Sequence, residues 1–307
     1  MAKKILITGA SGMIGTQLTD LLLAKNNSVA HLGRNKKGIV PSFVWDASNG
    51  VIDKDSLRQT DTIVHLAGAN VAGKRWTKGR KNEILESRVK SAELLFKTLE
   101  NNPHTIQTFI SASAIGYYGF GDENKIFTEE DKPGNDFLAQ VTKHWEEAAD
   151  QFATLGIRTV KIRIGIVLSK KGGALHEMTK PIKFGVGSPL GTGKQFLSWI
   201  HVDDLCGIFM NAIEDEKMNG AYNATVDWCT NEEMTKAIAR SLHRPLWLPS
   251  VPSFILKIIL GEMADIVLNG SKVSSEKIKN RGFQFKFSKI ENALDDLLSP
   301  SPLERAG

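Results

Sequence analysis

The chain has 307 residues, of which 41% are hydrophobic and 24% charged, as expected for a globular protein with one large domain and a smaller appended part. The net charge is +5, but basic and acidic residues are interleaved, so we expect no nucleic-acid partner. The two cysteines exclude a disulfide framework and are typical of a reducing cytoplasm. The longest apolar stretch, Phe254 to Leu268, contains charged residues and cannot span a membrane, so we expect a cytoplasmic protein with no membrane partner.

Short apolar runs alternate with helical patterns through the first half of the chain. The runs are Lys4 to Thr8, Ser28 to Leu32, Phe43 to Trp45, Thr62 to Leu66, Thr108 to Ser111 and Thr159 to Val167, and the longest helical patterns are Lys81 to Leu99 and Asp136 to Leu155. Alternating strands and helices favour a parallel sheet with helices on both faces. We therefore predict an α/β fold with a doubly wound sheet of the Rossmann type.

The alternation weakens after about Lys170, where a glycine-rich stretch begins. Helical patterns return at Glu232 to Leu242 and from about Ser253, joined by a proline-marked connection. We predict a Rossmann domain at 1–168, with a returning segment at about 196–228. Residues 169–195 and 229–307 then form a smaller α/β layer on the substrate side, over the strand ends where doubly wound sheets bind ligands.

A glycine-rich turn, Thr8 to Gly15, separates the first predicted strand from an amphipathic helix. Glycines at its three positions allow a tight turn, close approach of the backbone to a pyrophosphate and close packing of helix on sheet, and the helix N-terminus supplies N–H groups. A tight loop without a ligand is the alternative, which the strand and helix context disfavours. The candidate cofactor-binding residues here are Gly9, Ser11, Gly12, Met13, Ile14 and Gly15.

The residue after the second strand indicates which dinucleotide binds. Proteins that bind NAD place an Asp or Glu about 20 residues past the last glycine, on the ribose 2′-hydroxyl. This chain has Arg34 there, which can pair with a 2′-phosphate through two hydrogen bonds. We therefore predict NADP as the cofactor. The alternative, a solvated basic turn, is our interpretation of the neighbouring Lys36 and Lys37.

Further candidates follow the third and fourth strands. Asp46 could accept a hydrogen bond from the adenine amino group, or could simply form a turn. Leu66, Ala67 and Gly68 provide the small residues that a cofactor crossing the strand ends requires. His65 lies in an apolar run, and we expect it to be a packed histidine rather than a ligand. The histidines have no metal-like spacing, so we predict no metal site.

The loop after the fifth strand, Ser111 to Gly119, carries hydroxyl and phenol groups. It lies where a carbonyl substrate would meet a nicotinamide. The alternative is a Ser/Gly turn with tyrosines in the core.

Five motifs together resemble the extended short-chain dehydrogenases, the NAD-dependent epimerase/dehydratase group. They are TGxxGxxG at Thr8 to Gly15, HLAG at His65 to Gly68, SASA at Ser111 to Ala114, WIHVDD at Trp199 to Asp204 and GAYNA at Gly220 to Ala224. Within this group the chain is most similar to a branch of epimerase-like proteins often labelled as cell-division inhibitors. That branch shows AGxxxxxKRWT, here Ala67 to Thr77, and a C-terminal region of unknown function, here about Pro245 to Leu298.

The resemblance implies roles for individual residues. Ser113 resembles the active-site hydroxyl that binds the reacting oxygen, Arg88 a cofactor contact, and Ile166 a residue near the nicotinamide. The family's Y-x-x-x-K dyad is altered, because Lys143 matches the lysine but Ala139 stands at the tyrosine. Tyr117 is our candidate for the missing phenol, slightly ahead of Tyr118.

Two functions are consistent with these residues. The first is an NADP-dependent oxidoreductase or epimerase that acts on a small molecule such as a sugar nucleotide or carbonyl compound. The second, suggested by the altered dyad, is a catalytically silent NADP(H)-binding sensor or interaction protein. We expect a monomer or homodimer.

Overall fold

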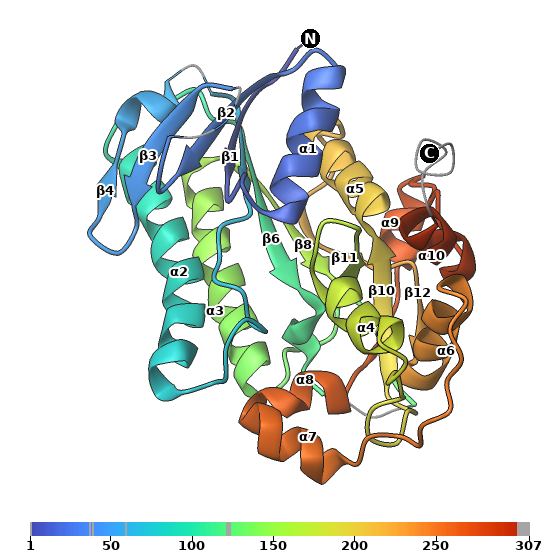
Figure 1. Cartoon of the computed structure of the whole chain (residues 1–307). Helices are drawn as coiled ribbons and strands as arrows, with labels where there is room; N and C mark the ends of the chain where they lie inside the picture. Colours follow the sequence, from blue (N-terminus) through green and yellow to red (C-terminus); the bar gives the residue numbers. More distant parts are fainter. Residues whose placement is uncertain (1, 37, 39, 59, 121–123, 300–307) are drawn as a thin grey trace.

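A computed structural model describes residues 2–36, 38, 40–58, 60–120 and 124–299. Its main sheet has the strand order β11-β8-β6-β5-β1-β2-β3-β4, parallel except for the edge strand β4. The strands are β1 (Lys4–Thr8), β2 (Ser28–Gly33), β3 (Ser42–Asp46), β4 (Val51–Ile52), β5 (Thr62–His65), β6 (Thr108–Ala114), β8 (Arg158–Ile164) and β11 (Gly220–Ala224). The prediction of a doubly wound α/β fold is confirmed (Figure 1).

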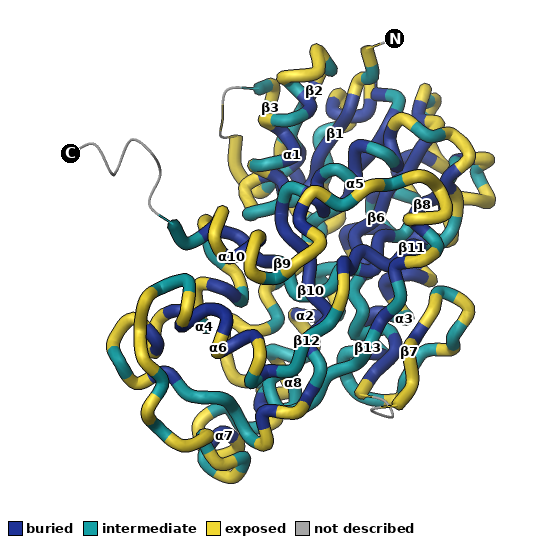
Figure 2. Tube along the Cα trace, turned by 90° about the vertical axis from the view of Figure 1, so that its right-hand side faces the viewer, coloured by how far each residue is buried: buried dark blue, intermediate teal, exposed yellow. Residues whose placement is uncertain are grey.

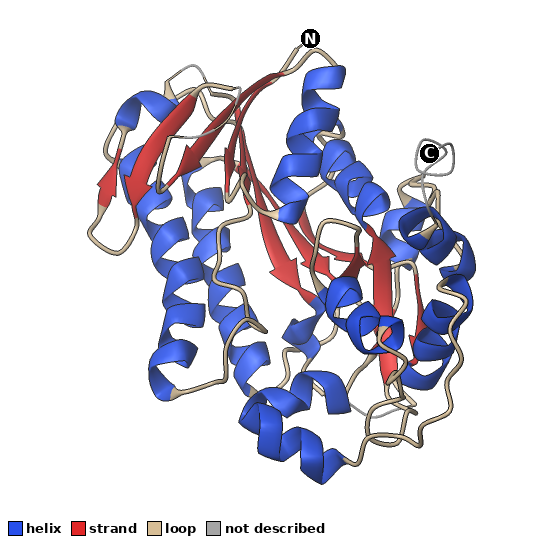
Figure 3. Ribbon diagram, viewed as in Figure 1, coloured by secondary structure: helices blue, strands red, loops and turns tan. Residues whose placement is uncertain are grey.

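A pair of helices covers each face of this sheet (Figure 3). The pairs are α1 (Met13–Ala24) with α5 (Val202–Glu214), and α2 (Lys78–Glu100) with α3 (Phe137–Asp150). Alternate residues of β1 serve the two cores: Ile5 and Ile7 pack with Leu18 of α1, whereas Leu6 packs with Leu95 of α2. Strand periodicity therefore explains why both faces of the sheet are buried.

Smaller elements complete the structure beside the strand ends. Two further sheets contain β9 (Ile166–Leu168), β10 (Phe196–His201) and β12 (Asp227–Thr230), and β7 (Ile126–Phe127) with β13 (Lys272–Val273). The remaining α-helices are α4 (Ala174–Lys183), α6 (Asn231–Ser241), α7 (Ser253–Leu260), α8 (Asp265–Leu268), α9 (Glu276–Asn280) and α10 (Ile290–Leu298). Short 3-10 turns are η1 (Lys54–Leu57), η2 (Ile115–Tyr118), η3 (Gln151–Leu155) and η4 (Gly261–Ala264).

The apolar run from Thr159 to Val167, predicted as one strand, is divided at Gly165. A Cβ atom at Gly165 would lie 2.7 Å from the carbonyl oxygen of Ser198, so only glycine fits where the chain leaves β8 and enters the smaller sheet as β9. The predicted returning segment likewise contributes to both sheets, since β11 joins the main sheet and β10 the smaller one. The predicted domain boundaries stay a prediction, and Met1 and residues 300–307 lie outside the described residues.

The WIHVDD motif fastens the C-terminal region to the main domain. The buried carboxylate of Asp204 accepts hydrogen bonds from the backbone N–H groups of Lys286, at 2.7 Å, and Phe287, at 3.0 Å. His201 stacks on the Phe287 ring with 3.8 Å between ring centroids. Burial raises the pKa of Asp204, although the two backbone N–H bonds oppose that rise. The motif therefore has a structural role here.

Burial is concentrated in the main sheet, whereas α4 and α7 are exposed over about half of their length (Figure 2). In the part of the chain that the structure describes, every helix is too short or too polar to cross a bilayer.

Candidate functional site

The glycine-rich turn lies at the topological switch point of the sheet, where β1 has β2 on one side and β5 on the other. Gly9 has a φ of +66°, and a Cβ atom there would lie 2.8 Å from the carbonyl group of Leu66. At Gly15 a Cβ atom would lie 2.6 Å from the Cα of Ala10. The turn is thus pressed against the end of β5 and against its own helix, as the glycine pattern predicts.

The first turn of α1 is available to an anion. Its N-cap is the exposed Gly12, and among the described residues no side chain caps the helix and no carboxylate lies in its first turn. Ser11 is exposed, and Met13 and Ile14 are half-buried beside it. Free N–H groups at a helix N-terminus bind phosphate groups well.

Positive charge gathers beside this turn, at the carboxyl end of β2 and the start of α2. Arg34 is exposed directly after β2. A hydrogen bond from Arg80, followed by the charges of Arg80, Lys74 and Arg34, lowers the pKa of Glu83. Residues from two separate segments therefore place three cations around the carboxylate of Glu83.

Arg88 is a half-buried cation without a counter-ion among the described residues. Its Nη1 donates to the carbonyl oxygen of Ile84 at 2.8 Å, its guanidinium lies 4.9 Å from the ring centroid of Trp145, and no described carboxylate pairs with it. Partial burial, with a contribution from the charge of Arg80, lowers the pKa of Arg88 to about 10. A Cβ atom at Gly68 would lie 3.1 Å from the Arg88 guanidinium carbon, so Gly68 makes room for this side chain. A partly desolvated cation that no described carboxylate neutralises favours a bound anion.

Other candidates are more conventional. The carboxylate of Asp46 accepts hydrogen bonds from the N–H groups of Ser48 and Asn49, which is the turn-forming alternative. His65 is fully buried between Thr8 and Ser91, at 2.8 and 3.0 Å, and burial lowers its pKa to about 3. It is the packed histidine that the sequence predicts.

The same region includes Leu66 and Ala67, whose backbone N–H groups both donate to the Thr8 hydroxyl at 3.2 Å. Ile166, the candidate near the nicotinamide, is half-buried at the start of β9.

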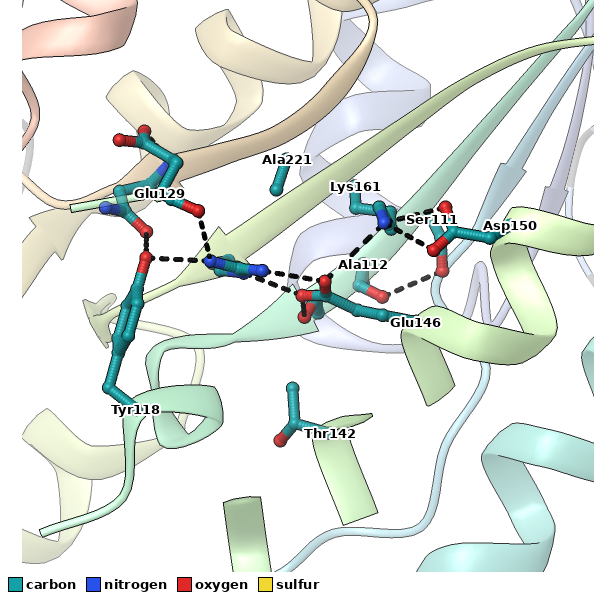
Figure 4. Close-up of polar contacts among 12 residues, drawn as sticks. Ser111, Ala112, Tyr118, Glu129, Thr142, Glu146, Asp150, Lys161 and Ala221 are labelled. Atoms are coloured by element: carbon teal, nitrogen blue, oxygen red, sulfur yellow. Dashed lines mark hydrogen bonds and ion pairs between the residues drawn. The ribbon is translucent and has the colours of Figure 1, made fainter. Parts of the chain in front are cut away.

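Ser113 lies in a buried polar network between β6, β8 and α3. Its hydroxyl donates to Oε1 of Glu146, which Figure 4 labels, at 2.6 Å. Arg163 holds the same carboxylate through two hydrogen bonds, of 2.8 and 2.9 Å. Ser113 is only 2% exposed and its hydroxyl proton is engaged with Glu146.

The two tyrosines of η2 have different environments. The buried Tyr118 hydroxyl donates to Asn223 at 2.6 Å and accepts from Arg163 at 3.0 Å (Figure 4). Burial raises the pKa of Tyr118 to about 12. Tyr117 is half-buried, and the Arg163 guanidinium lies 3.6 Å from its ring centroid. Among the described residues, no group hydrogen-bonds to the Tyr117 hydroxyl.

The helix that carries the dyad positions departs from the expected arrangement. Ala139 is fully buried in α3. The Lys143 side chain is 43% exposed and lies 3.8 Å from Glu147, one turn further along the helix. The cation in contact with Tyr117 is Arg163 rather than Lys143.

Four charged residues of this region were not predicted: Lys74, Arg80, Glu146 and Arg163. Glu146 and Arg163 had a usable signal, since Glu146 falls on the buried face of α3 and Arg163 lies next to Ile162 in the buried strand β8. The KRWT motif contains Lys74 and precedes Arg80, but its spacing alone does not show that it approaches Arg34.

Comparison with known proteins agrees with this arrangement. Residues 5–225 match the NAD dependent epimerase/dehydratase family, and residues 251–297 match a domain of unknown function. The epimerase family protein YfhF of Bacillus subtilis is 36% identical over 300 residues, covering 96% of this chain and 98% of YfhF. The chloroplastic SDR39U1 homolog of Arabidopsis thaliana is 36% identical over 297 residues, covering 94% of this chain and 84% of the homolog.

A solved structure is also similar along nearly the whole chain. The human epimerase family protein SDR39U1 (isoform 2), crystallised with NADPH, is 30% identical with a TM-score of 0.85, covering 96% of this chain and 99% of the human one. The motifs, the fold and these matches agree, and the chain belongs to the NAD-dependent epimerase/dehydratase family.

Proposed function

We propose that this protein binds NADPH and is an oxidoreductase or epimerase acting on a small molecule in the cytoplasm. The observation that carries the proposal is the position of Arg34, directly after β2, where an NAD-binding protein has a carboxylate. Lys74 and Arg80 add positive charge nearby, and Arg80 also pairs with Glu83 at 2.6 Å. The human relative crystallised with NADPH supports the same choice.

The residues present fit this cofactor. The first turn of α1 and the glycines before it would hold the pyrophosphate, Arg34 would hold the 2′-phosphate, and Arg88 is a half-buried cation that an anion would neutralise. The cofactor supplies a hydride, and the protein supplies position and electrostatics. A sugar nucleotide or a carbonyl compound is the proposed substrate class.

Tyr117 is the proposed proton donor. Reduction of a carbonyl requires a proton as well as a hydride, and a well-placed acid contributes about 10²- to 10⁴-fold to such a step. Arg163 fixes the Tyr117 ring from one side, and Glu146 and Ser113 fix Arg163. Ser113 is thus proposed as a positioning residue, and Lys143 stays a candidate cation near the substrate.

Fluorescence titration tests the cofactor assignment. NADPH is expected to bind at least about ten-fold more tightly than NADH, a difference of about 1.4 kcal/mol. Arg34→Asp should reverse this preference, whereas Lys36→Asp, which changes the charge of the same turn by the same amount, should retain it. Equal affinities of the native protein for the two cofactors would contradict the role of Arg34.

Turnover tests the role of Tyr117. A screen of carbonyl and sugar-nucleotide compounds for NADPH oxidation would supply a substrate, after which Tyr117→Phe should lower turnover about 100-fold without weakening NADPH binding. Tyr118→Phe is the control, because its hydroxyl is engaged in the core.

The buried Ala139 favours the second candidate function, a catalytically silent NADPH-binding sensor. Tight NADPH binding with no turnover in the whole screen would support that function instead.

A further inference from the structure

The segment 253–264, formed by α7 and η4, is attached at its two ends. On one side Val251 exchanges backbone hydrogen bonds with Pro189 and Gly191, at 2.9 and 2.8 Å. On the other side Gln195 donates to the carbonyl oxygen of Val267 at 2.8 Å. Figure 1 shows this segment with α8 as a corner of the molecule near the lower ends of α2 and α3.

Between these attachments the segment is lightly packed. Of the eight residues of α7 only Leu256 is buried, and Phe254, Ile258 and Ile259 are 64%, 70% and 61% exposed. The part of the C-terminal region that follows is held much more firmly, since Val273 bonds to Ser198 and Thr225 in the interior. Segments with few buried contacts open at low free-energy cost, and lids are drawn from them.

The corner of this segment touches the start of α2 through polar contacts. Glu262 forms an ion pair with Lys81, in the first turn of α2. Gly261, with a φ of +62°, lies so close to Arg75 that a Cβ atom there would be 2.9 Å from the guanidinium Nη2. Among the described residues, Lys81 is the one outside the C-terminal region that makes an ion pair or side-chain hydrogen bond with 253–264.

These contacts involve the segment between β5 and α2, which also carries candidate cofactor-binding residues. Arg75 and Lys81 belong to the connection from Gly68 into α2, which also provides Lys74 and Arg80 beside Arg34. Trp76 packs edge-on against Phe137 of α3 with 4.9 Å between ring centroids. This contact holds in place the segment that Gly261 and Glu262 touch.

We propose that residues 253–264 form a flap that retains NADPH, and that the contact of Glu262 and Gly261 with Lys81 and Arg75 is its closed position. The inference rests on the proposed binding of NADPH. The proposal gives a function to the lightly packed first part of the C-terminal region. Its later part, around Lys286 and Phe287, attaches the region to the main domain through Asp204. Because the closing contact is an exposed ion pair, it is readily broken, and the flap can open for exchange of the dinucleotide.

The rate of NADPH release tests whether the Glu262–Lys81 ion pair keeps the flap closed. Glu262→Lys places two ammonium groups opposite each other, and stopped-flow fluorescence should show release about fivefold faster, the upper range for an exposed pair. The added positive charge by itself would slow the release of an anionic ligand, so the sign separates the flap from general electrostatics. The double variant Lys81→Glu/Glu262→Lys should restore the native rate to within about twofold.

The matched control is Glu214→Lys, which breaks the exposed Lys25–Glu214 pair between α1 and α5 with the same change in charge. Its NADPH release should equal that of the native protein. Release from Glu262→Lys that is unchanged or slower, or a double variant that fails to restore the rate, overturns the flap. Failure of the native protein to bind NADPH in an equilibrium titration overturns the proposed function and the flap together, whereas tight binding with the wrong kinetics overturns the flap alone.

Hydrogen exchange provides a second readout if Glu262→Lys does not fold. Amides of 253–264 should exchange more slowly with NADPH bound, and Glu262→Gln should reduce that protection. Equal exchange with and without NADPH would contradict the proposal.

Discussion

Removal of the Glu146 carboxylate tests the buried network beneath Tyr117. Glu146→Leu leaves the Arg163 guanidinium 4% exposed with neither of its two bonds to a carboxylate, and leaves the Ser113 hydroxyl without its acceptor. Breaking a buried pair in this way costs about 3–5 kcal/mol. Burial alone would lower the pKa of Arg163, but its bonds to Glu146 and the Glu146 charge outweigh burial and hold that pKa above its ordinary value. An arginine side chain is not deprotonated in proteins, so in the variant the guanidinium stays charged without its counter-ion and keeps only its bonds to Tyr118 and the Glu129 carbonyl oxygen.

Urea unfolding followed by circular dichroism gives the magnitude. With an m value of about 3 kcal/mol/M, a loss of about 4 kcal/mol lowers the midpoint by about 1.3 M. Glu147→Leu is the control, because Glu147 is the next residue of the same helix and its pairs with Lys143 and His144 are exposed, which limits the cost to about 1 kcal/mol.

A second variant separates a buried charge from a general packing defect. Glu146→Leu/Arg163→Met removes both charges, and an apolar replacement of a buried pair is often neutral, so we expect it to recover at least about 2 kcal/mol of the loss. The reasoning is refuted if Glu146→Leu costs no more than Glu147→Leu, or if the double variant is the least stable of the three.

Three further outcomes follow from the geometry. Gly12→Val should abolish NADPH binding in a fluorescence titration yet keep the native circular dichroism, since φ at Gly12 is −76° and the nearest atom to an added Cβ is 3.2 Å away, whereas Gly9→Val should misfold. Ser113→Ala should lower the free energy of unfolding by about 1.5–3 kcal/mol, the range for a hydrogen bond to a charged group, with unchanged NADPH affinity. Because His65 is held neutral with its pKa lowered to about 3, the unfolded chain binds the extra proton below about pH 6.5. Stability should therefore fall by about 2 kcal/mol between pH 7.5 and pH 5 through this group, and His65→Gln should flatten that slope in urea unfolding.

Periodicity was sufficient to predict six strands of the main sheet, β1, β2, β3, β5, β6 and β8, and the helices α1, α2 and α3, but not β4 or β11. The apolar run Lys4 to Thr8 is β1 as predicted, and the helical pattern from Lys81 extends back only one turn further than expected. The division of β8 from β9 at Gly165 was not predictable, because it depends on Ser198, which approaches only in the folded chain. Helix α5 was hidden within a motif: WIHVDD was recognised as a family signature, and the helix that begins at Val202 was not predicted.

In the site, too, features set by neighbouring residues could be predicted from the sequence, whereas features set by distant residues could not. The glycine turn could be predicted because each glycine serves a need defined by its immediate neighbours, whereas the role of Ser113 depends on Glu146, which is 33 residues away in sequence. Two charges gave a signal: Glu146 shares the buried face of α3 with Ala139, Thr142 and Ala149, and Arg163 lies in a buried strand. Opposite charges on the buried sides of two elements predict a pair, because an unpaired charge would be too costly to bury.

The Glu146–Arg163 pair also gives Tyr117 and Tyr118 different environments. The sequence of these two adjacent residues does not indicate that difference. The edge of the Arg163 guanidinium bonds to Glu146 and to the Tyr118 hydroxyl, which leaves its planar face for the Tyr117 ring. One tyrosine is thereby fixed by its hydroxyl and the other by its ring, and among the described residues only the second has a hydroxyl without a hydrogen-bond partner. On the proposed function, Tyr117 would give the proton that Ala139 cannot give, because Glu146 and Ser113 hold the cation against its ring.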